Sequence, residues 1–335
     1  MKTVSLNVEN LCVPCGCRCR HCLLAYDGTV IGAGYEQGKR FARRMAAESP
    51  IKFNYYIGFC MDTPMLFDYI AFCQEIGSPG GRFLQMNGLR ERPCDEIERL
   101  MERIKGSGVE LIDLTFYGLP DYHDAFAGRP GDFRLLTEML AAANKARLPV
   151  NISVPVFEDN AGQIERLFDI LSEYQTDNTS LYLPHSKGRG WFMEPQRLKK
   201  STLEQLPPSV QAHMPKVKTQ SECQWLSENV FPEPDRRCLT LSLTPDNFER
   251  YNNMSAEEII GELEMLDDAF YAAVPSAEEL AKLYGNPFGD RLFRYRDLVL
   301  LWTNRYVREN GLQLHDMTDE RGHFSTRQSA PEKSD

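Results

Sequence analysis

Five cysteines lie close together near the amino end of the chain, and three of them have a spacing that suits metal binding. Cys15, Cys19 and Cys22 form a CxxxCxxC pattern, with Cys12 and Cys17 beside them. Three thiolates can hold three corners of a four-iron, four-sulfur cube and leave its fourth iron open to a ligand that is not protein. The triplet therefore predicts an iron-sulfur cluster with a reactant at the open iron.

These cysteines could serve in two other ways. Cys12, Cys15, Cys19 and Cys22 form two CxxC pairs that could hold zinc, but only residues 16–18 separate the pairs, against the usual ~12 to 20 residues between paired zinc ligands. A disulfide framework is less favoured, because the sequence begins at Met1 without an apolar signal segment and spreads ten cysteines over 335 residues. The cluster is the favoured interpretation.

The triplet follows a predicted first strand at residues 4–8, and in this setting it resembles the signature of radical S-adenosylmethionine (radical SAM) enzymes. The resemblance implies that Cys15, Cys19 and Cys22 ligate a [4Fe-4S] cluster and that S-adenosylmethionine binds the open iron through its amino and carboxylate groups. Reductive cleavage would then give a 5'-deoxyadenosyl radical. An electron donor such as flavodoxin or ferredoxin is the implied partner. His21 stands where the family usually has an aromatic residue, and its flat ring could cover the cluster similarly.

Composition limits the partners and the setting. Acidic residues exceed basic ones by 48 to 38, giving a net charge of −10, so general nucleic-acid binding is not expected. The longest apolar run found near the carboxyl end, residues 298–302, is far below the ~20 residues needed to cross a bilayer. We therefore expect a soluble protein without membrane partners. A cluster of thiolates implies a cytoplasmic, reducing and anaerobic setting.

Apolar strands alternate with helical patterns through the first half of the chain, which predicts parallel βα units and an α/β fold. The predicted strands are residues 4–8, 53–58, 83–86, 111–116, 150–156 and 180–183. The family resemblance implies a partial (β/α)6 barrel over residues 1–195. A mainly helical domain is expected at 196–318, with helices opened by Ser255 and Ser276, and a disordered tail at 319–335. Residues 238–243 could add a strand, without indicating whether it joins the barrel.

The resemblance also assigns positions for S-adenosylmethionine. Gly58 and Asp62 lie in the stretch after strand two, where the family binds the amine. Thr115, at the end of strand four, matches a ribose-binding hydroxyl, with Asn151 or Ser153 on strand five beside it. Pro184, after strand six, would flank the adenine. Thr115 and Ser153 equally suit a strand that binds nothing.

Residues 116–124 and 128–133 resemble the stretch that follows the fourth strand in radical SAM maturases. This places Tyr117, His123 and Asp124 near the barrel mouth as candidate catalytic residues. His123 and Asp124 could instead only order their own loop, and Asp132 suits the N-cap of the next helix. Cys60 could donate its S–H hydrogen to a substrate radical or be a buried free thiol.

The resemblance thus implies a radical SAM enzyme that abstracts hydrogen from a substrate, either a peptide or a small molecule. Only Cys223 and Cys238 lie beyond Pro184, too few for an auxiliary cluster held by four thiolates. A glycyl-radical-enzyme activase is an alternative with the same chemistry. A non-catalytic iron-sulfur or zinc scaffold, or an electron carrier, is the alternative from another class.

Overall fold

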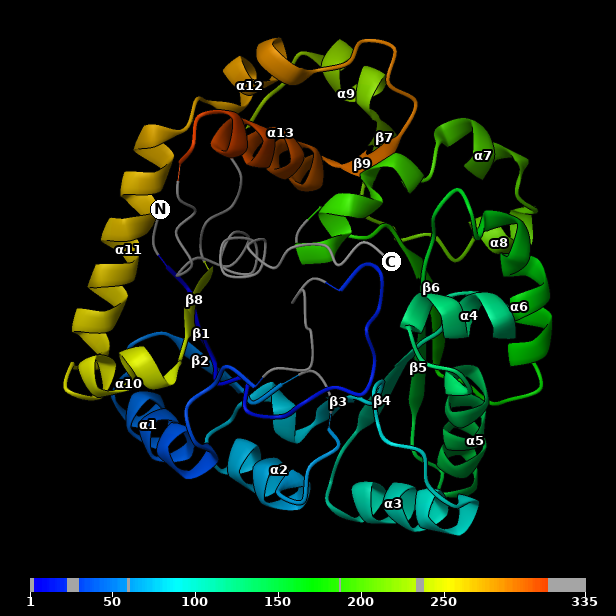
Figure 1. Ribbon diagram of the computed structural model, residues 1–335, viewed down its shortest axis with the longest axis vertical. Coiled ribbons are helices and arrows are strands. Elements are labelled where there is room, and N and C mark those ends of the chain that lie inside the picture. The colour runs from blue at the N-terminus through cyan, green and yellow to red at the C-terminus, as the bar shows by residue number, and fades with distance from the viewer. Residues whose placement is uncertain (1–2, 23–29, 59–60, 187, 233–237, 313–335) are drawn as a thin grey trace.

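A curved wall of parallel strands forms the body of the protein. The computed structural model describes residues 3–22, 30–58, 61–186, 188–232 and 238–312. The strands of this wall run in two sheets, β2-β1-β8 and β3-β4-β5-β6, in which every hydrogen-bonded pair is parallel, and a separate antiparallel pair, β7-β9, lies outside the wall. Figure 1 shows the strands following one curve from β8 to β6, with helices α1 to α6 on its outer side. The predicted α/β fold, an incomplete barrel of βα units, is confirmed.

All six predicted strands are present, each followed by a helical segment. The strands are β1 (Ser5–Glu9), β2 (Lys52–Tyr56), β3 (Phe83–Gln85), β4 (Leu111–Thr115), β5 (Val150–Pro155) and β6 (Asn178–Tyr182). The helices and short 3-10 turns between them are α1 (Tyr35–Glu48), α2 (Leu66–Glu75), η1 (Pro79–Gly81), α3 (Cys94–Gly106), α4 (Pro120–Ala127), α5 (Asp132–Lys145), η2 (Ala161–Gln163) and α6 (Ile164–Leu171).

The helices form because their apolar residues recur on one side. In α3, Ile97, Met101 and Ile104 are buried, while Arg99 on the opposite face is exposed. Acidic residues in the first turn of α3 and basic residues in its last turn complement the helix dipole. The apolar stripes seen in the sequence are therefore core.

A seventh strand from the carboxyl half extends the wall. β8 (Cys238–Ser242) pairs with β1 in parallel register, from Ser5 opposite Cys238 to Glu9 opposite Ser242. The sequence left the place of residues 238–243 open, because a parallel partner can lie far away in the chain. Part of the expected C-terminal domain thus contributes to the barrel wall.

The remaining elements are mainly helical, as expected. They are η3 (Gly188–Gln196), α7 (Lys200–Gln205), α8 (Pro208–Gln211), β7 (Thr219–Ser221), α9 (Glu222–Glu228), α10 (Pro245–Asn252), α11 (Ala256–Ala273), α12 (Ala277–Tyr284), β9 (Leu292–Arg294) and α13 (Tyr295–Glu309). The predicted caps are confirmed: Ser255 and Ser276 each accept a hydrogen bond from the backbone N–H three residues on. Trp225 and Trp302 lie in a second, smaller core with Phe293. The expected tail at 319–335 lies outside the described residues.

The two faces of the wall differ in polarity. On the outer face, residues such as Leu6, Ile112 and Ile152 are fully buried against the helices. Alternate positions carry polar side chains instead: Asn7, Asn54, Asp113, Asn151, Ser153 and Ser180. Sheets covered on both faces by apolar packing lack this alternation, and the interior of a closed barrel is filled largely by branched apolar residues. The inner face of this wall is therefore suited to polar ligands.

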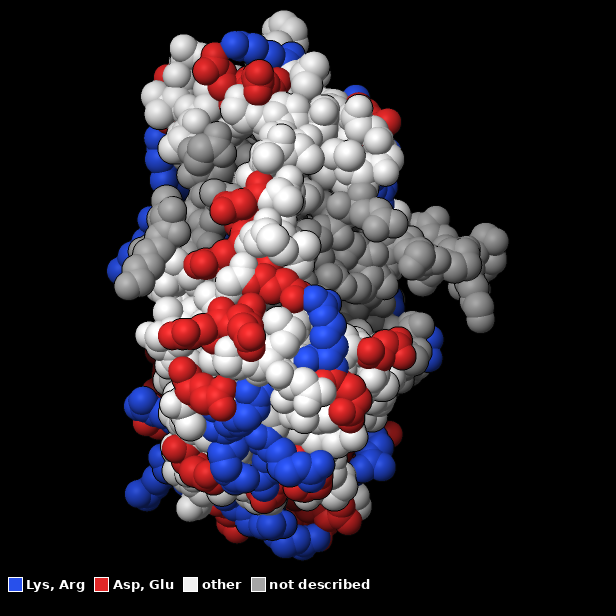
Figure 2. Space-filling view, turned by 90° about the vertical axis from the view of Figure 1, so that its left-hand side faces the viewer, with Lys and Arg blue, Asp and Glu red and all other residues white. Residues whose placement is uncertain are grey.

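Charges of both signs occupy the side of the molecule shown in Figure 2. Helix α11 carries six acidic residues and no Lys or Arg, whereas α1 carries Lys39, Arg40, Arg43 and Arg44. Arg44 donates to the carbonyl oxygens of Tyr251 and Met254 at the end of α10, so it ties the first helix to the carboxyl half. Within the described residues, no helix combines the length and apolar character needed to cross a membrane.

Candidate functional site

The cysteine loop follows the carboxyl end of β1 and lies across the mouth of the barrel. Backbone hydrogen bonds fix it to four neighbouring segments. They run from Cys12 N to Ile57 O (3.0 Å), from Gly16 N to Gly88 O (3.0 Å), from Arg18 N to Ala127 O (2.7 Å) and from Arg189 N to Cys22 O (2.9 Å). These partners lie after β2, after β3, at the end of α4 and after β6. The loop is thus positioned by most of the barrel, at the edge where reactive groups of βα barrels gather.

The three cysteines of the triplet are each partly exposed, whereas Cys17 between them is buried. Hydrogen bonds from Cys17 and from Tyr117 lower the pKa of Cys19; the hydroxyl of Tyr117 lies 3.1 Å from its sulfur. Hydrogen bonds to Cys15 and Cys19, together with burial, raise the pKa of Cys17. These contacts thus favour loss of the proton from Cys19 over loss of the proton from Cys17.

The donor set suits a four-iron cube in number and kind. Within the described ranges, no three His, Cys, Asp or Glu side chains converge on one metal position. In a four-iron cube each thiolate binds a different iron, so three separated, partly exposed thiolates on one fixed loop suit it in number and kind.

His21 packs beside the triplet. Its ring contacts those of Tyr117 and Phe126, both with centroids 5.3 Å away, and its Nε2 lies 3.1 Å from the hydroxyl of Tyr182. Burial and the charge of His185 lower the pKa of His21 to about 4, so the ring is neutral near pH 7. Its Nδ1 is buried without a hydrogen-bond partner among the described residues. One polar atom therefore remains available next to the cysteines.

Of the candidate catalytic residues, His123 and Asp124 are engaged in local structure. His123 is fully buried; its Nδ1 accepts from the Tyr117 N–H (3.0 Å) and its Nε2 lies 3.0 Å from Asp132. Asp124 accepts from the backbone N–H groups of Gly131 and Phe133 and so caps α5. The N-cap residue of α5 is Gly131 rather than Asp132, whose carboxylate instead binds His123 and Arg129. The hydroxyl of Tyr117, by contrast, reaches the sulfur of Cys19 in the triplet.

The candidate ribose-binding residues lie together on the inner face of β4 and β5. Thr115 is opposite Ser153 and Asp113 is opposite Asn151. The Ser153 hydroxyl donates to Asp113 Oδ2 at 2.9 Å, and burial raises the pKa of Asp113. Sequence reasoning missed Asp113, although its position two residues before Thr115 places it on the same face.

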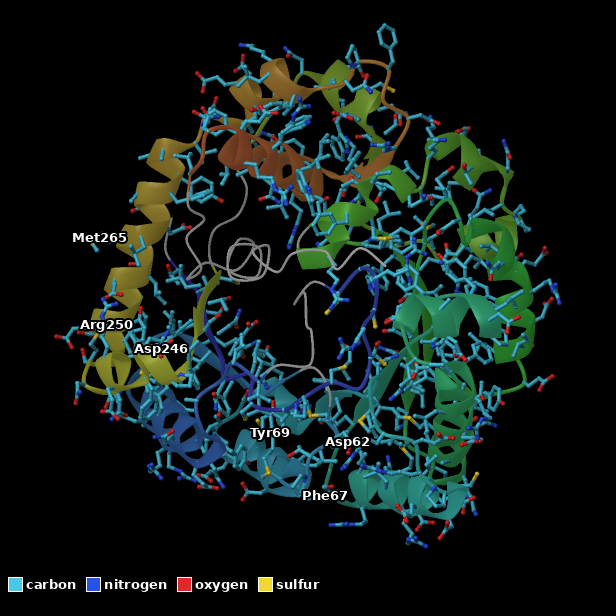
Figure 3. The ribbon with its side chains drawn as sticks, viewed as in Figure 1. Asp62, Phe67, Tyr69, Asp246, Arg250 and Met265 are labelled. Atoms are coloured by element: carbon cyan, nitrogen blue, oxygen red, sulfur yellow. The ribbon has the colours of Figure 1, made fainter. Side chains whose placement is uncertain are left out.

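The other cofactor candidates lie apart. Gly58 follows β2 and borders a cavity. Both carboxylate oxygens of Asp62 accept hydrogen bonds from arginines, Oδ2 from Arg90 Nε at 3.0 Å and Oδ1 from Arg92, so Asp62 ties the loop after β2 to the loop after β3. Figure 3 labels Asp62 near α2. The Pro184 carbonyl accepts from the buried Arg197 at 2.8 Å. Cys60 lies outside the described residues.

A buried ionic group that sequence reasoning missed joins the end of β6 to η3. Arg197 donates to Glu194 (2.7 Å) and to the Ser186 hydroxyl (3.0 Å), and Asn304 of α13 donates to the Ser186 carbonyl. Nearby, His185 lies 3.0 Å from the fully buried Asp297 of α13. Both contacts hold the carboxyl-terminal helix against the mouth of the barrel. Their partners are up to 118 residues apart, so no local pattern could have indicated them.

No protein-family model matches the chain, and no curated protein matches it. Among solved structures, SuiB of Streptococcus suis bound to the precursor peptide SuiA is similar over 55% of this chain and 40% of its own (14% identity, TM-score 0.42). For anSMEcpe with bound AdoMet the coverage is 54% and 51% (15% identity, TM-score 0.40). This chain thus spans about half or less of the length of those proteins. Coproporphyrinogen III oxidase (HemN) from Escherichia coli is matched over 91% of both chains (11% identity, TM-score 0.42). The solved structures that resemble this chain therefore include an enzyme described as a radical SAM enzyme, the class that its cysteine motif resembles.

Proposed function

We propose that this chain is a radical SAM enzyme in which Cys15, Cys19 and Cys22 hold a [4Fe-4S] cluster. The observation that carries the proposal is the CxxxCxxC loop at the carboxyl end of β1, fixed across the mouth of a parallel barrel. When bound, the cluster supplies the electron that cleaves S-adenosylmethionine to a 5'-deoxyadenosyl radical, which abstracts hydrogen from the substrate.

The residues around the triplet would hold and shield these groups. Tyr117 donates to the sulfur of Cys19, and the neutral ring of His21 covers the loop from the side of Tyr182. Thr115 and Ser153 present hydroxyls on the inner wall, where the family binds the ribose. Aromatic and apolar groups beside the cysteines, including Phe126, limit access of water and oxygen. The chain's task is to orient the cofactor and keep the reacting atoms dry.

The substrate is a peptide or a small molecule that reaches the inner wall. Its reacting C–H bond must lie close to the 5' carbon of the radical, at the carboxyl ends of the strands. The polar inner face indicates a substrate that exchanges hydrogen bonds with the barrel.

The test is release of 5'-deoxyadenosine by anaerobically reconstituted protein given dithionite and S-adenosylmethionine, measured by chromatography. We expect the wild type to release the product and Cys19→Ala to lose both cluster iron and product. Cys94→Ala is the matched control, since Cys94 is an exposed free cysteine on α3. Product from Cys19→Ala at the wild-type rate would refute the proposal, and a wild type that holds zinc and releases no product would favour the non-catalytic scaffold.

A further inference from the structure

A cavity of about 220 Å³ lies where the two sheets meet. Strands β2 and β3 belong to separate sheets, and no ladder joins them within the described residues. The cavity occupies this break between Tyr56 and Gly58 on one side and Gln85 on the other, and Asp113 of β4 borders it too. It is thus continuous with the polar inner face.

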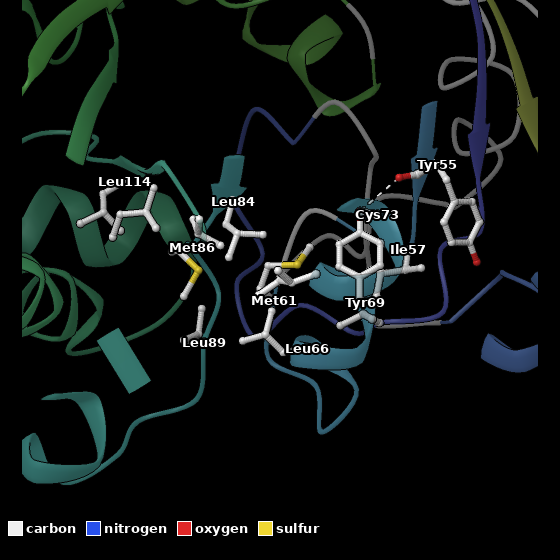
Figure 4. Close-up of a cluster of buried hydrophobic side chains, with 14 of the residues drawn as sticks. Tyr55, Ile57, Met61, Leu66, Tyr69, Cys73, Leu84, Met86, Leu89 and Leu114 are labelled. Atoms are coloured by element: carbon white, nitrogen blue, oxygen red, sulfur yellow. Dashed lines mark hydrogen bonds between the residues drawn. The ribbon is translucent and has the colours of Figure 1, made fainter. Parts of the chain in front are cut away.

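Aromatic and aliphatic side chains form most of its wall. Tyr69 of α2 and Phe83 of β3 border it, along with Met61 and Leu84. Figure 4 shows Met61, Tyr69 and Leu84 in one buried cluster, in which the Tyr69 hydroxyl donates to the Tyr55 carbonyl at 3.1 Å. That hydrogen bond fixes the Tyr69 ring as a wall of the cavity. Aromatic faces attract organic cations through their quadrupoles.

Among the described residues that line the cavity, Asp113 is the one with an acidic or basic side chain. Its Oδ2 accepts from Ser153, and its Oδ1 has no hydrogen bond to any described residue. Arg82 lies 5.8 Å from the Phe83 ring centroid, but it is paired with Glu110 and does not line the cavity. Burial without a cation raises the pKa of the Asp113 carboxyl. A positively charged ligand would supply the missing counter-charge.

The size of the cavity limits its occupant. An engineered apolar cavity of about 150 Å³ binds benzene, so about 220 Å³ accommodates a single ring with a short substituent, or an alkyl chain of similar volume.

We propose that this cavity binds the substrate through an ammonium group on a single ring or short chain, with Asp113 as the counter-ion and the rings of Tyr69 and Phe83 as walls. That the bound molecule is the substrate rests on the proposed function. Benzylamine represents a free amine, and Nα-acetyl-lysine methylamide represents a lysine side chain of a peptide.

Isothermal titration calorimetry of the full chain, without reductant, tests the binding itself, so failure of the radical chemistry would not affect the readout. We expect at least one of the two amines to bind, and the tighter one identifies the source of the ammonium group. Benzyl alcohol, the neutral analogue of benzylamine, should bind at least about tenfold more weakly than the amine, and benzoate should not bind. Asp113→Asn should weaken the amine at least about tenfold, while Asp169→Asn, an exposed acid on α6, should leave it unchanged.

Thermal unfolding of each variant verifies that it is folded. Leu111→Phe, which narrows the cavity without touching a charge, is a second variant that should weaken amine binding. Three results would overturn the proposal: no binding of either amine, equal binding of amine and alcohol, or unchanged affinity in folded Asp113→Asn. Displacement of the amine by S-adenosylmethionine would overturn it too, because the cavity would then hold the cofactor's own amine.

Discussion

Asp132 carries a buried charge on which both the barrel and the cysteine loop depend. Its side chain is fully buried; it binds His123 at 3.0 Å, receives the Arg129 guanidinium, and lies 3.7 Å from the sulfur of Cys17. Asp132→Asn removes the charge but keeps the size. It leaves Arg129, whose side chain is only 18% exposed, without its counter-ion. Breaking a buried ion pair in this way costs about 3 to 5 kcal/mol, and we expect the free energy of unfolding to fall by that amount.

Anaerobic urea denaturation, followed by fluorescence, measures the loss. Asp121→Asn is the control, since Asp121 is exposed in the first turn of α4. Partners lower the pKa of Asp132 in the folded chain, so its contribution is present above the unfolded pKa of about 4 and disappears as the pH falls through the folded value. The difference between wild type and Asp132→Asn should therefore shrink in acid. A loss below about 1 kcal/mol at pH 7, or a difference that grows in acid, would contradict this reasoning.

Three further changes have distinct outcomes. Tyr117→Phe removes the hydrogen bond to the sulfur of Cys19. If that hydrogen bond contributes about 1 kcal/mol, its loss should lower the cluster's midpoint potential by roughly 40 mV, measured by EPR-monitored titration. An unchanged potential would show that the hydroxyl does not reach the ligand. Arg197→Met leaves the buried Glu194 carboxylate without its counter-ion and should lower the free energy of unfolding, measured by urea denaturation, by about 3 to 5 kcal/mol. Unchanged stability would show that the ion pair has no structural role. Ser276→Ala should cost about 1 kcal/mol, and a loss smaller than roughly 0.3 kcal/mol would argue against the cap.

Local sequence patterns predicted the wall of the barrel well. The strands were recognisable because apolar residues such as Ile112, Leu114 and Ile152 alternate with polar ones or form short runs between turns. The caps at Ser255 and Ser276 were recognisable because the serine and the glutamate three residues on form a local unit. Each of these signals lies within one element.

Features that join distant elements could not be predicted in this way. The pairing of β8 with β1 is set by the return of the chain after more than 200 residues, with Cys238 opposite Ser5. His123 and Asp124 resemble reactive groups in the sequence. In the structure His123 binds a backbone N–H and Asp132, and Asp124 binds the start of a helix. Strand alternation places Asp113 on the same face as Thr115, but only the register shows that it lies opposite Asn151.

The most direct test of the central claim is EPR spectroscopy of the dithionite-reduced, reconstituted protein before and after addition of S-adenosylmethionine. A cube held by Cys15, Cys19 and Cys22 has one open iron, so we predict that the [4Fe-4S] signal changes when the cofactor's amino and carboxylate groups bind there. Cys94→Ala should show the same change. A reduced cluster whose signal is unaffected by S-adenosylmethionine, or the absence of any cluster signal from iron-loaded protein, would contradict the account.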